Sequence, residues 1–153
     1  MIDINNESGL VIDETGLVRL AGFVLSQLRI HPRADLSILL VDEPTMESYN
    51  TTFMDHPGPT DVLAFPMDEL RAPEGDDAPP RGMLGDVVLC PAVSAAQAAQ
   101  AGRGTRAELE YLLVHGVLHL LGYDHGEPAE KAVMFALNDR LIADWNAGRR
   151  DAR

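Results

Sequence analysis

The feature that most constrains the fold of this chain is an apolar segment, residues 111–121, that carries two histidines. The segment reads YLLVHGVLHLL, and apolar residues on every side are typical of a helix that is buried on most of its surface. Such a helix requires other elements packed around it, and 153 residues are enough for one domain with a single core. Imidazoles in that helix need a hydrogen-bond partner or a ligand.

Three histidines are spaced so that they can bind one metal ion. His115 and His119 lie one turn apart on one face of the predicted helix, with Cβ atoms about 6 Å apart. Gly122 can end the helix in a left-handed turn, after which the chain doubles back and offers His125. Three neutral imidazoles leave a fourth tetrahedral position open, as in catalytic zinc sites. The spacing predicts a metal site; the alternative is two core histidines bonded to carbonyl groups beside an exposed His125.

The same spacing occurs in the metzincin proteases, which are therefore an alternative class. In those enzymes a glutamate directly after the first histidine is the general base. This chain has Gly116 at that position, and a site without the carboxylate cannot activate water for peptide hydrolysis by that route. Met134 could suggest the metzincin Met-turn, but it lies in a helical pattern and is expected in the core. The sequence therefore disfavours a peptidase.

Three further side chains are candidates for supporting roles. Asp124 is next to the third histidine, and Asp86 opens a predicted strand; either carboxylate could orient a ligand or a water molecule. A turn or a cap is the more typical role for both. Cys90 is expected to be a buried strand residue. The sequence identifies no general base, so the catalytic residues stay unassigned.

Hydrophobic periodicity and turn residues predict four strands mixed with about five helices, which implies an α/β or α+β layered domain. The strands are expected within 2–9, 36–41, 62–66 and 86–91, and the helices within 13–30, from about 45, and within 92–101, 105–121 and 128–145. An acidic segment rich in proline and glycine, 67–84, is expected to be a flexible loop, either functional or simply disordered. The tail 147–153 is expected to fray. The order of the strands cannot be predicted.

Local signals suggest where several helices begin and end. Asp13 can cap the first helix, and His31, which precedes a proline, is expected to end it. Thr105 and Glu108 have the spacing of a capping box at the start of the histidine-bearing helix. A proline at position 128 is expected to open the last helix.

The composition favours a cytoplasmic protein and disfavours generic binding to polyanions. No segment has the length and hydrophobicity of a membrane span, and the N-terminus does not resemble a signal peptide. A single cysteine excludes an internal disulfide. The net charge of −12 is unfavourable for phosphate contacts, which need lysine and arginine.

Four sequence blocks resemble the YbeY family of bacterial endoribonucleases over essentially the whole chain. They are HGVLHLLGYDH (115–125), PTDVLAFP (59–66), LGDVVLCP (84–91) and MFALNDRLIADW (134–145). The resemblance implies a zincin-like α+β fold, with a mixed four-stranded sheet and helices around it, in a single domain spanning 1–153. It also implies one zinc ion per chain, held by His115, His119 and His125.

The resemblance further implies a function. Members of the family are single-strand-specific endoribonucleases that mature the 3′ end of 16S ribosomal RNA and act in ribosome quality control. Ribosomal RNA and ribosome-associated proteins are the expected partners, in the cytoplasm, with no role for a membrane or for DNA. The chain departs from the family at Met54, where many members carry an arginine, and at Ala64, where serine is usual.

Two questions follow from this implied function. Either water or the 2′-hydroxyl of the RNA could attack phosphorus, and the sequence does not choose between them. The charge needed for RNA is expected from arginines near the C-terminus, among Arg103, Arg106, Arg140, Arg149 and Arg150, with ribosomal partners supplying most of the affinity. A non-catalytic assembly factor whose zinc only stabilises the fold is a further alternative.

Overall fold

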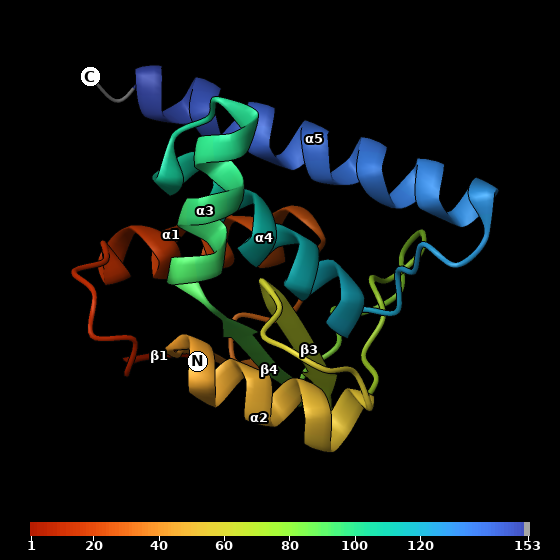
Figure 1. Ribbon diagram of the computed structural model, residues 1–153. Helices are drawn as coiled ribbons and strands as arrows, with labels where there is room; N and C mark the ends of the chain where they lie inside the picture. Colours follow the sequence, from red (N-terminus) through yellow and green to blue (C-terminus); the bar gives the residue numbers. More distant parts are fainter. Residues whose placement is uncertain (152–153) are drawn as a thin grey trace.

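The computed structural model describes residues 1–151 as a mixed sheet surrounded by helices (Figure 1). Within this range it has four strands and five helices, which confirms the predicted α+β class. The elements in chain order are β1 (Ile2–Asn6), α1 (Glu14–Gln27), β2 (Asp35–Leu40), α2 (Glu43–Met54), β3 (Val62–Pro66), β4 (Met83–Leu89), α3 (Pro91–Ala101), α4 (Thr105–Leu120) and α5 (Pro128–Asp151). No helix of this described part is long and apolar enough to cross a membrane.

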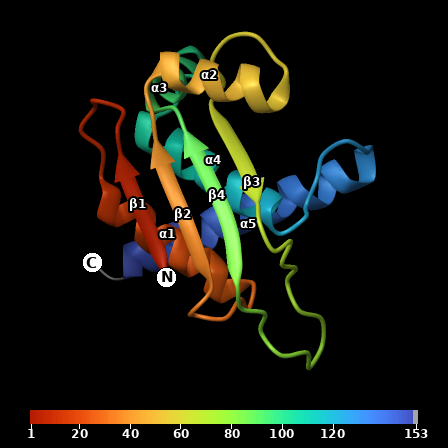
Figure 2. The same cartoon turned by 90° about the horizontal axis from the view of Figure 1, so that it is seen from below.

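The strands lie in the order β1-β2-β4-β3 (Figure 2). β1 pairs with β2, and β2 with β4, in parallel, whereas β3 pairs antiparallel with β4. β3 is consequently an edge strand, paired on one side only. This edge position matters because the residues before and along β3 reach the functional site.

The helices cover the two faces of the sheet unequally (Figures 1 and 2). The main core lies between the sheet and α1, α4 and α5, and a smaller cluster lies between the sheet and α2. The smaller cluster consists of Val41, Met46, Leu63, Val88 and Cys90. The two clusters are separate because successive residues of a strand point to opposite faces.

Helix α4 runs through the main core and approaches the sheet closely at Gly116. Most of its residues are buried, which confirms the prediction of a helix enclosed on most sides. A Cβ atom at Gly116 would lie 2.7 Å from Cγ1 of Val87 and 3.3 Å from Cγ2 of Val62. Only glycine allows this separation, which places the C-terminal half of α4 directly over β4 and the edge strand β3.

Two predictions about the first and fourth helices were wrong. α1 is capped by Asp13 as predicted, but it ends at Gln27, because Arg29 adopts a left-handed conformation (φ 59°) well before His31. The N-cap of α4 is Gly104, so Thr105 is the first helical residue and forms no capping box. Two other helices are longer than predicted: α2 begins at Glu43, and α5 continues through Asp151.

Residues 67–82 of the acidic segment contain no helix or strand, as predicted, but the last two residues of the predicted loop, 83 and 84, belong to β4. The backbone of the segment is nevertheless attached to the end of α1. The guanidinium of Arg29 donates to the carbonyl oxygens of Gly75 (2.7 Å) and Asp77 (3.0 Å). The backbone N–H of His31 donates to the carbonyl oxygen of Pro80 (2.9 Å). Whether this segment is flexible stays a prediction. In the C-terminal tail, which was expected to fray, residues 147–151 are helical, and residues 152–153 lie outside the described residues.

Candidate metal centre

Three histidines from the end of α4 and the turn that follows it converge at one point. One nitrogen from each of His115, His119 and His125 lies within 4.8 Å of the other two. The Nε2 atoms of His115 and His119 face each other at 3.1 Å. The ring of His125 stands 5.6 Å from that of His115 and 5.1 Å from that of His119, measured between centroids. The three side chains singled out from the sequence are therefore brought together.

The turn after α4 brings His125 back towards the helix. Gly122 has a φ of +90°, its N–H donates to His119 O (3.0 Å), and the N–H of Tyr123 donates to Leu118 O (3.1 Å). These two bonds are those of a Schellman motif with glycine at C′, as expected from the sequence. A side chain at Gly122 would also collide with the guanidinium of Arg71, which lies against it.

Burial keeps the two helical histidines neutral. It lowers the pKa of His115 from its usual 6.5 to about 4, with further lowering by His119 and His125 and a smaller opposing effect of Asp61. It also lowers the pKa of His119, with a further contribution from His125, while Asp124 opposes the change. Neutral imidazole is the form that binds metal ions, so the environment favours ligation over protonation at neutral pH.

The geometry fits a metal ion bound by imidazole. Two nitrogens at about 2.0–2.1 Å from a tetrahedral zinc are roughly 3.3 Å apart, close to the observed 3.1 Å between the Nε2 atoms of His115 and His119. A shared proton could also link these two atoms, but it would leave His125 unexplained.

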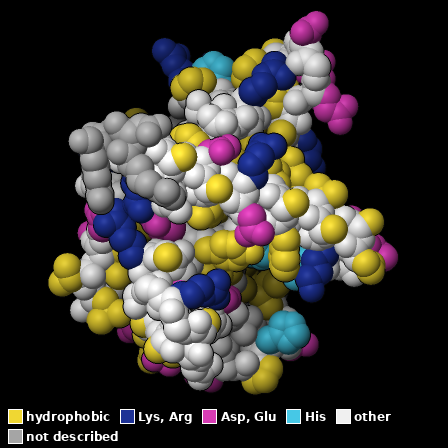
Figure 3. All heavy atoms as spheres, turned by 90° about the horizontal axis from the view of Figure 1, so that it is seen from above, with side chains coloured by type: hydrophobic (Ala, Val, Ile, Leu, Met, Phe, Trp, Pro, Cys, Tyr) yellow, Lys and Arg dark blue, Asp and Glu magenta, His cyan; other side chains and the backbone are white. Residues whose placement is uncertain are grey.

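The histidines form one wall of an open pocket of about 640 Å³. The space-filling view shows a hollow floored by hydrophobic side chains, with histidine at its edge (Figure 3). The opposite wall comes from the end of α2, the loop before β3 and β3 itself, including Met54, Thr60 and Ala64. Two carboxylates, those of Asp61 and Asp124, line the pocket, whereas no lysine or arginine of the described residues does so.

Asp61 is a site residue that the sequence reasoning did not identify. Its Oδ1 accepts hydrogen bonds from the N–H of Val62 (2.7 Å) and from Oγ1 of Thr60 (3.3 Å). It reaches the pocket because β3 is an edge strand beside α4. The only local signal was its position in the loop directly before a predicted strand. Asp124, by contrast, was identified, and its Oδ1 accepts from the N–H of His125 (2.7 Å).

The other candidate residues lie away from the pocket. Val87 faces α4, so its neighbour Asp86 points to the opposite face of the sheet and cannot support the histidines. Met134 is buried in the main core, as expected. Cys90 is buried as expected but is not a strand residue, because it follows β4 as the N-cap of α3; burial raises the pKa of its thiol.

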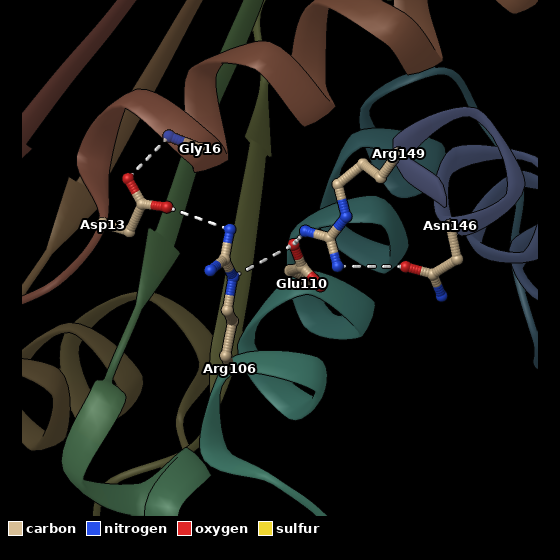
Figure 4. A network of polar contacts seen from close by, with 6 residues as sticks. All are labelled: Asp13, Gly16, Arg106, Glu110, Asn146 and Arg149. Atoms are coloured by element: carbon tan, nitrogen blue, oxygen red, sulfur yellow. Dashed lines mark hydrogen bonds and ion pairs between the residues drawn. The ribbon is translucent and has the colours of Figure 1, made fainter. Parts of the chain in front are cut away.

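The arginines expected to attract RNA are, where described, mostly engaged far from the histidines. Arg106 pairs with Asp13 (3.0 Å) and Glu110 (3.8 Å), and Arg149 pairs with Glu110 (3.0 Å), all at the N-terminal end of α4 (Figure 4). Arg103 pairs with Glu108 (2.8 Å). Arg140 is exposed on α5, and the side chain of Arg150 lies outside the described part. The expectation that these arginines supply positive potential for RNA stays a prediction, although three of them are paired with carboxylates.

Comparison with known proteins places the chain in a family. The family model "Endoribonuclease YbeY" matches residues 3–146. The chain belongs to the endoribonuclease YbeY family. Relatives named endoribonuclease YbeY include one from Cutibacterium acnes, 64% identical over 97% of this chain and 96% of the relative, and one from a Nocardioides species, 56% identical over 95% and 98%.

A solved structure supports the fold. The solution structure of a protein from Thermotoga maritima superposes with a TM-score of 0.66 at 25% sequence identity, covering 99% of this chain and 93% of the other. The match therefore covers nearly the whole of this chain, and the two proteins share a fold.

Proposed function

We propose that this protein is a zinc-dependent endoribonuclease that cleaves single-stranded RNA in the maturation of the 3′ end of 16S ribosomal RNA and in ribosome quality control. The observation that carries the proposal is the convergence of three histidine nitrogens, within 4.8 Å of one another, on the wall of an open pocket. The family supports it, because close relatives are named endoribonucleases. Ribosomal RNA and ribosome-associated proteins are the proposed partners, in the cytoplasm.

We assign the metal site to His115, His119 and His125, with zinc as the ion. Borderline-soft zinc is well suited to three neutral imidazoles, whereas magnesium and calcium prefer oxygen ligands. Bound there, zinc would act as a Lewis acid on a phosphodiester oxygen. An open pocket beside the ligands favours a catalytic site over one that only stabilises the fold.

The carboxylates of Asp61 and Asp124 are the proposed groups for proton transfer. Their hydrogen bonds to the protein use Oδ1, so Oδ2 of each can accept a proton from water or from a 2′-hydroxyl in the pocket. The two residues approach from opposite walls, one before β3 and one after α4. End-group identification distinguishes the attacking group, because a cyclic 2′,3′-phosphate product would exclude direct attack by water.

The structure argues against a peptidase on steric grounds. Position 116, which would carry the metzincin glutamate, faces the sheet, and even a Cβ atom there would contact Val87 at 2.7 Å. Gly116 lines the pocket but has no carboxylate, and the close approach of α4 to the sheet leaves no room for a side chain there. The pocket therefore lacks the general base on which that class depends.

Two cations border the pocket and are better placed for phosphate contacts than the paired arginines. Arg71 lies against Gly122, and Lys131 lies 5.4 Å from the ring centre of Phe135, which is itself 6.0 Å from that of His115. Neither cation forms an ion pair within the described residues. With so few cations at the site, we expect ribosomal partners to supply most of the affinity for RNA.

The proposal is tested by metal analysis and RNA cleavage with the wild type and His119→Ala. We expect about one zinc per wild-type chain and cleavage of a single-stranded ribosomal RNA fragment, with both lost in the variant while its circular dichroism spectrum is retained. His31→Gln is the matched control, since His31 lies outside the pocket, where its Nδ1 accepts from the N–H of Arg33. Metal-free wild type that cleaves RNA would overturn the proposal, and unfolding of His119→Ala would favour a structural zinc.

A further inference from the structure

An exposed group of aromatic side chains lies next to the histidine pocket and has no role in the metal site. Phe53, near the end of α2, is 61% exposed, which is unusual for a phenylalanine in a folded domain. Its ring stacks on Tyr49 (centroids 5.9 Å apart, planes 27° apart) and meets the ring of Phe65 edge-on (5.5 Å). We call these three residues the aromatic platform.

The platform adjoins the pocket around the edge of the sheet. Met54, directly after Phe53, lines the pocket, and so do Ala64 and Pro66, which flank Phe65 on β3. Because β3 is the edge strand, its two faces meet here without another strand between them. An RNA chain that crosses the pocket can therefore pass from the histidines to the platform around this edge.

The arrangement of the rings prepares Phe53 to stack on a ligand. Tyr49 supports one face of the ring and Phe65 touches it edge-on, which restricts its rotation. The side chain is nevertheless 61% exposed, so part of the ring stays accessible to a ligand. A ring fixed in this way loses little conformational entropy when a flat group binds.

Electrostatics select a base rather than a phosphate as the occupant. No lysine or arginine of the described residues lines the adjoining pocket, while Asp61 does, so this wall attracts no anion. A nucleobase is flat and uncharged, and base–aromatic stacking is sequence-tolerant. In a duplex both faces of each base are already covered by its neighbours, so only an unpaired base can stack on Phe53.

We propose that the aromatic platform binds an unpaired nucleobase of the RNA next to the cleaved bond, and that Phe53 thereby makes the enzyme prefer single-stranded substrate. The inference rests on the proposed endoribonuclease function. It differs from that function because it concerns substrate selection, which is independent of metal binding.

The test compares Phe53→Ala, Phe53→Leu and Phe53→Trp on one single-stranded oligoribonucleotide. Loss of a stacked base raises KM by about 5- to 150-fold, and we expect this in Phe53→Ala and Phe53→Leu, with kcat and zinc content unchanged and KM restored in Phe53→Trp. The ratio of KM between variant and wild type should not change with salt, since stacking releases no counterions. Val11→Ala is the control, because Val11 is a fully exposed apolar residue that lines a different pocket from the one with the histidines.

A second measurement locates the base. Oligonucleotides with one abasic position each are cleaved by the wild type and by Phe53→Ala. We expect one abasic position near the cleaved bond to raise KM for the wild type and to have no further effect in the variant. Equal KM values for wild type and Phe53→Ala would overturn the inference, as would retained binding by Phe53→Leu, which would indicate a merely apolar contact. If the wild type itself does not cleave RNA, the proposed function fails instead.

Discussion

The two ends of helix α4 both hold polar side chains in largely apolar surroundings, and they satisfy them differently. At the N-terminal end, the buried carboxylate of Glu110 accepts a hydrogen bond from Arg149 (3.0 Å) and lies 3.8 Å from Nε of Arg106. At the C-terminal end, Nε2 of His115 faces Nε2 of His119 at 3.1 Å. Glu110 thus has partners of opposite charge within the protein, whereas the two imidazole nitrogens face each other.

This difference distinguishes buried polar groups that stabilise the fold from polar groups that are arranged to bind a ligand. Buried polar groups are normally hydrogen-bonded because an unpaired one is costly. The cluster around Glu110 follows this rule and joins α1, α4 and α5 (Figure 4). The histidines instead bring three nitrogens together in a pocket open to solvent, which is expected where a metal ion completes the site. Four predictions test this distinction, beginning with the largest expected effect.

Replacing His115 by leucine should abolish metal binding and RNA cleavage while the metal-free protein stays folded. Disturbing a group that only supports a metal ligand costs about 10- to 100-fold in metal affinity, so losing the ligand itself should cost at least as much. Leucine is apolar and suits the buried helix, so the metal-free variant should unfold at the same temperature as the metal-free wild type or higher. A large fall in that temperature would show that the imidazole has a structural role.

The stability of the metal-free wild type should fall as pH falls from about 6.5 to 4. Burial lowers the pKa of His115 from 6.5 to about 4, so over this range the unfolded chain binds a proton that the folded chain does not. The stabilising contribution is present above pH 6.5 and is lost on acidification, and the difference amounts to about 3 kcal/mol. Urea unfolding in the presence of a chelator measures the free energy of unfolding at each pH. Carboxylates also contribute to its pH dependence, but His115→Leu should lack only the part that is due to His115.

Replacing Glu110 by glutamine should destabilise the protein without affecting the site. The change leaves the guanidinium groups of Arg106 and Arg149 without their buried counter-charge. Because both arginines are partly exposed, we expect a loss of about 1–3 kcal/mol, less than for a fully buried pair. Thermal unfolding measures the loss, while zinc content and kcat per folded molecule should match the wild type. A specific loss of kcat would contradict the division of α4 into two independent ends.

The contrast between the two ends also shows what the sequence could predict. The histidine cluster was predicted because its three members lie within eleven residues of each other and Gly122 signals the turn between them. Asp61 was missed, because its place in the pocket depends on β3 pairing at the edge of the sheet, and strand order is not encoded locally. The same holds for Glu110, whose partner Arg149 lies on α5, far along the chain.

Errors at helix ends have a physical origin as well. α1 ends with Arg29 in a left-handed conformation, a position that usually holds glycine, so no local signal was present. That arginine is instead held by carbonyl groups of the 67–82 segment. The apparent capping box failed because Gly104 is the N-cap, so Thr105 lies one position too far into the helix. Glu108 instead pairs with Arg103, which lies before the helix.

The smallest expected effect concerns Arg71, the cation beside Gly122. Unlike the arginines at the other end of α4, it has no acidic partner within the described residues, and Nη1 donates only to the carbonyl oxygens of Glu69 and Leu70 (3.0 Å each). If it contacts a phosphate, Arg71→Gln should weaken RNA binding modestly and reduce the slope of log affinity against log salt by about 1. Arg81→Gln, in the same segment but away from the pocket, should leave the slope unchanged. An equal slope in wild type and Arg71→Gln would show that this end of α4 relies on the metal and on neutral contacts alone.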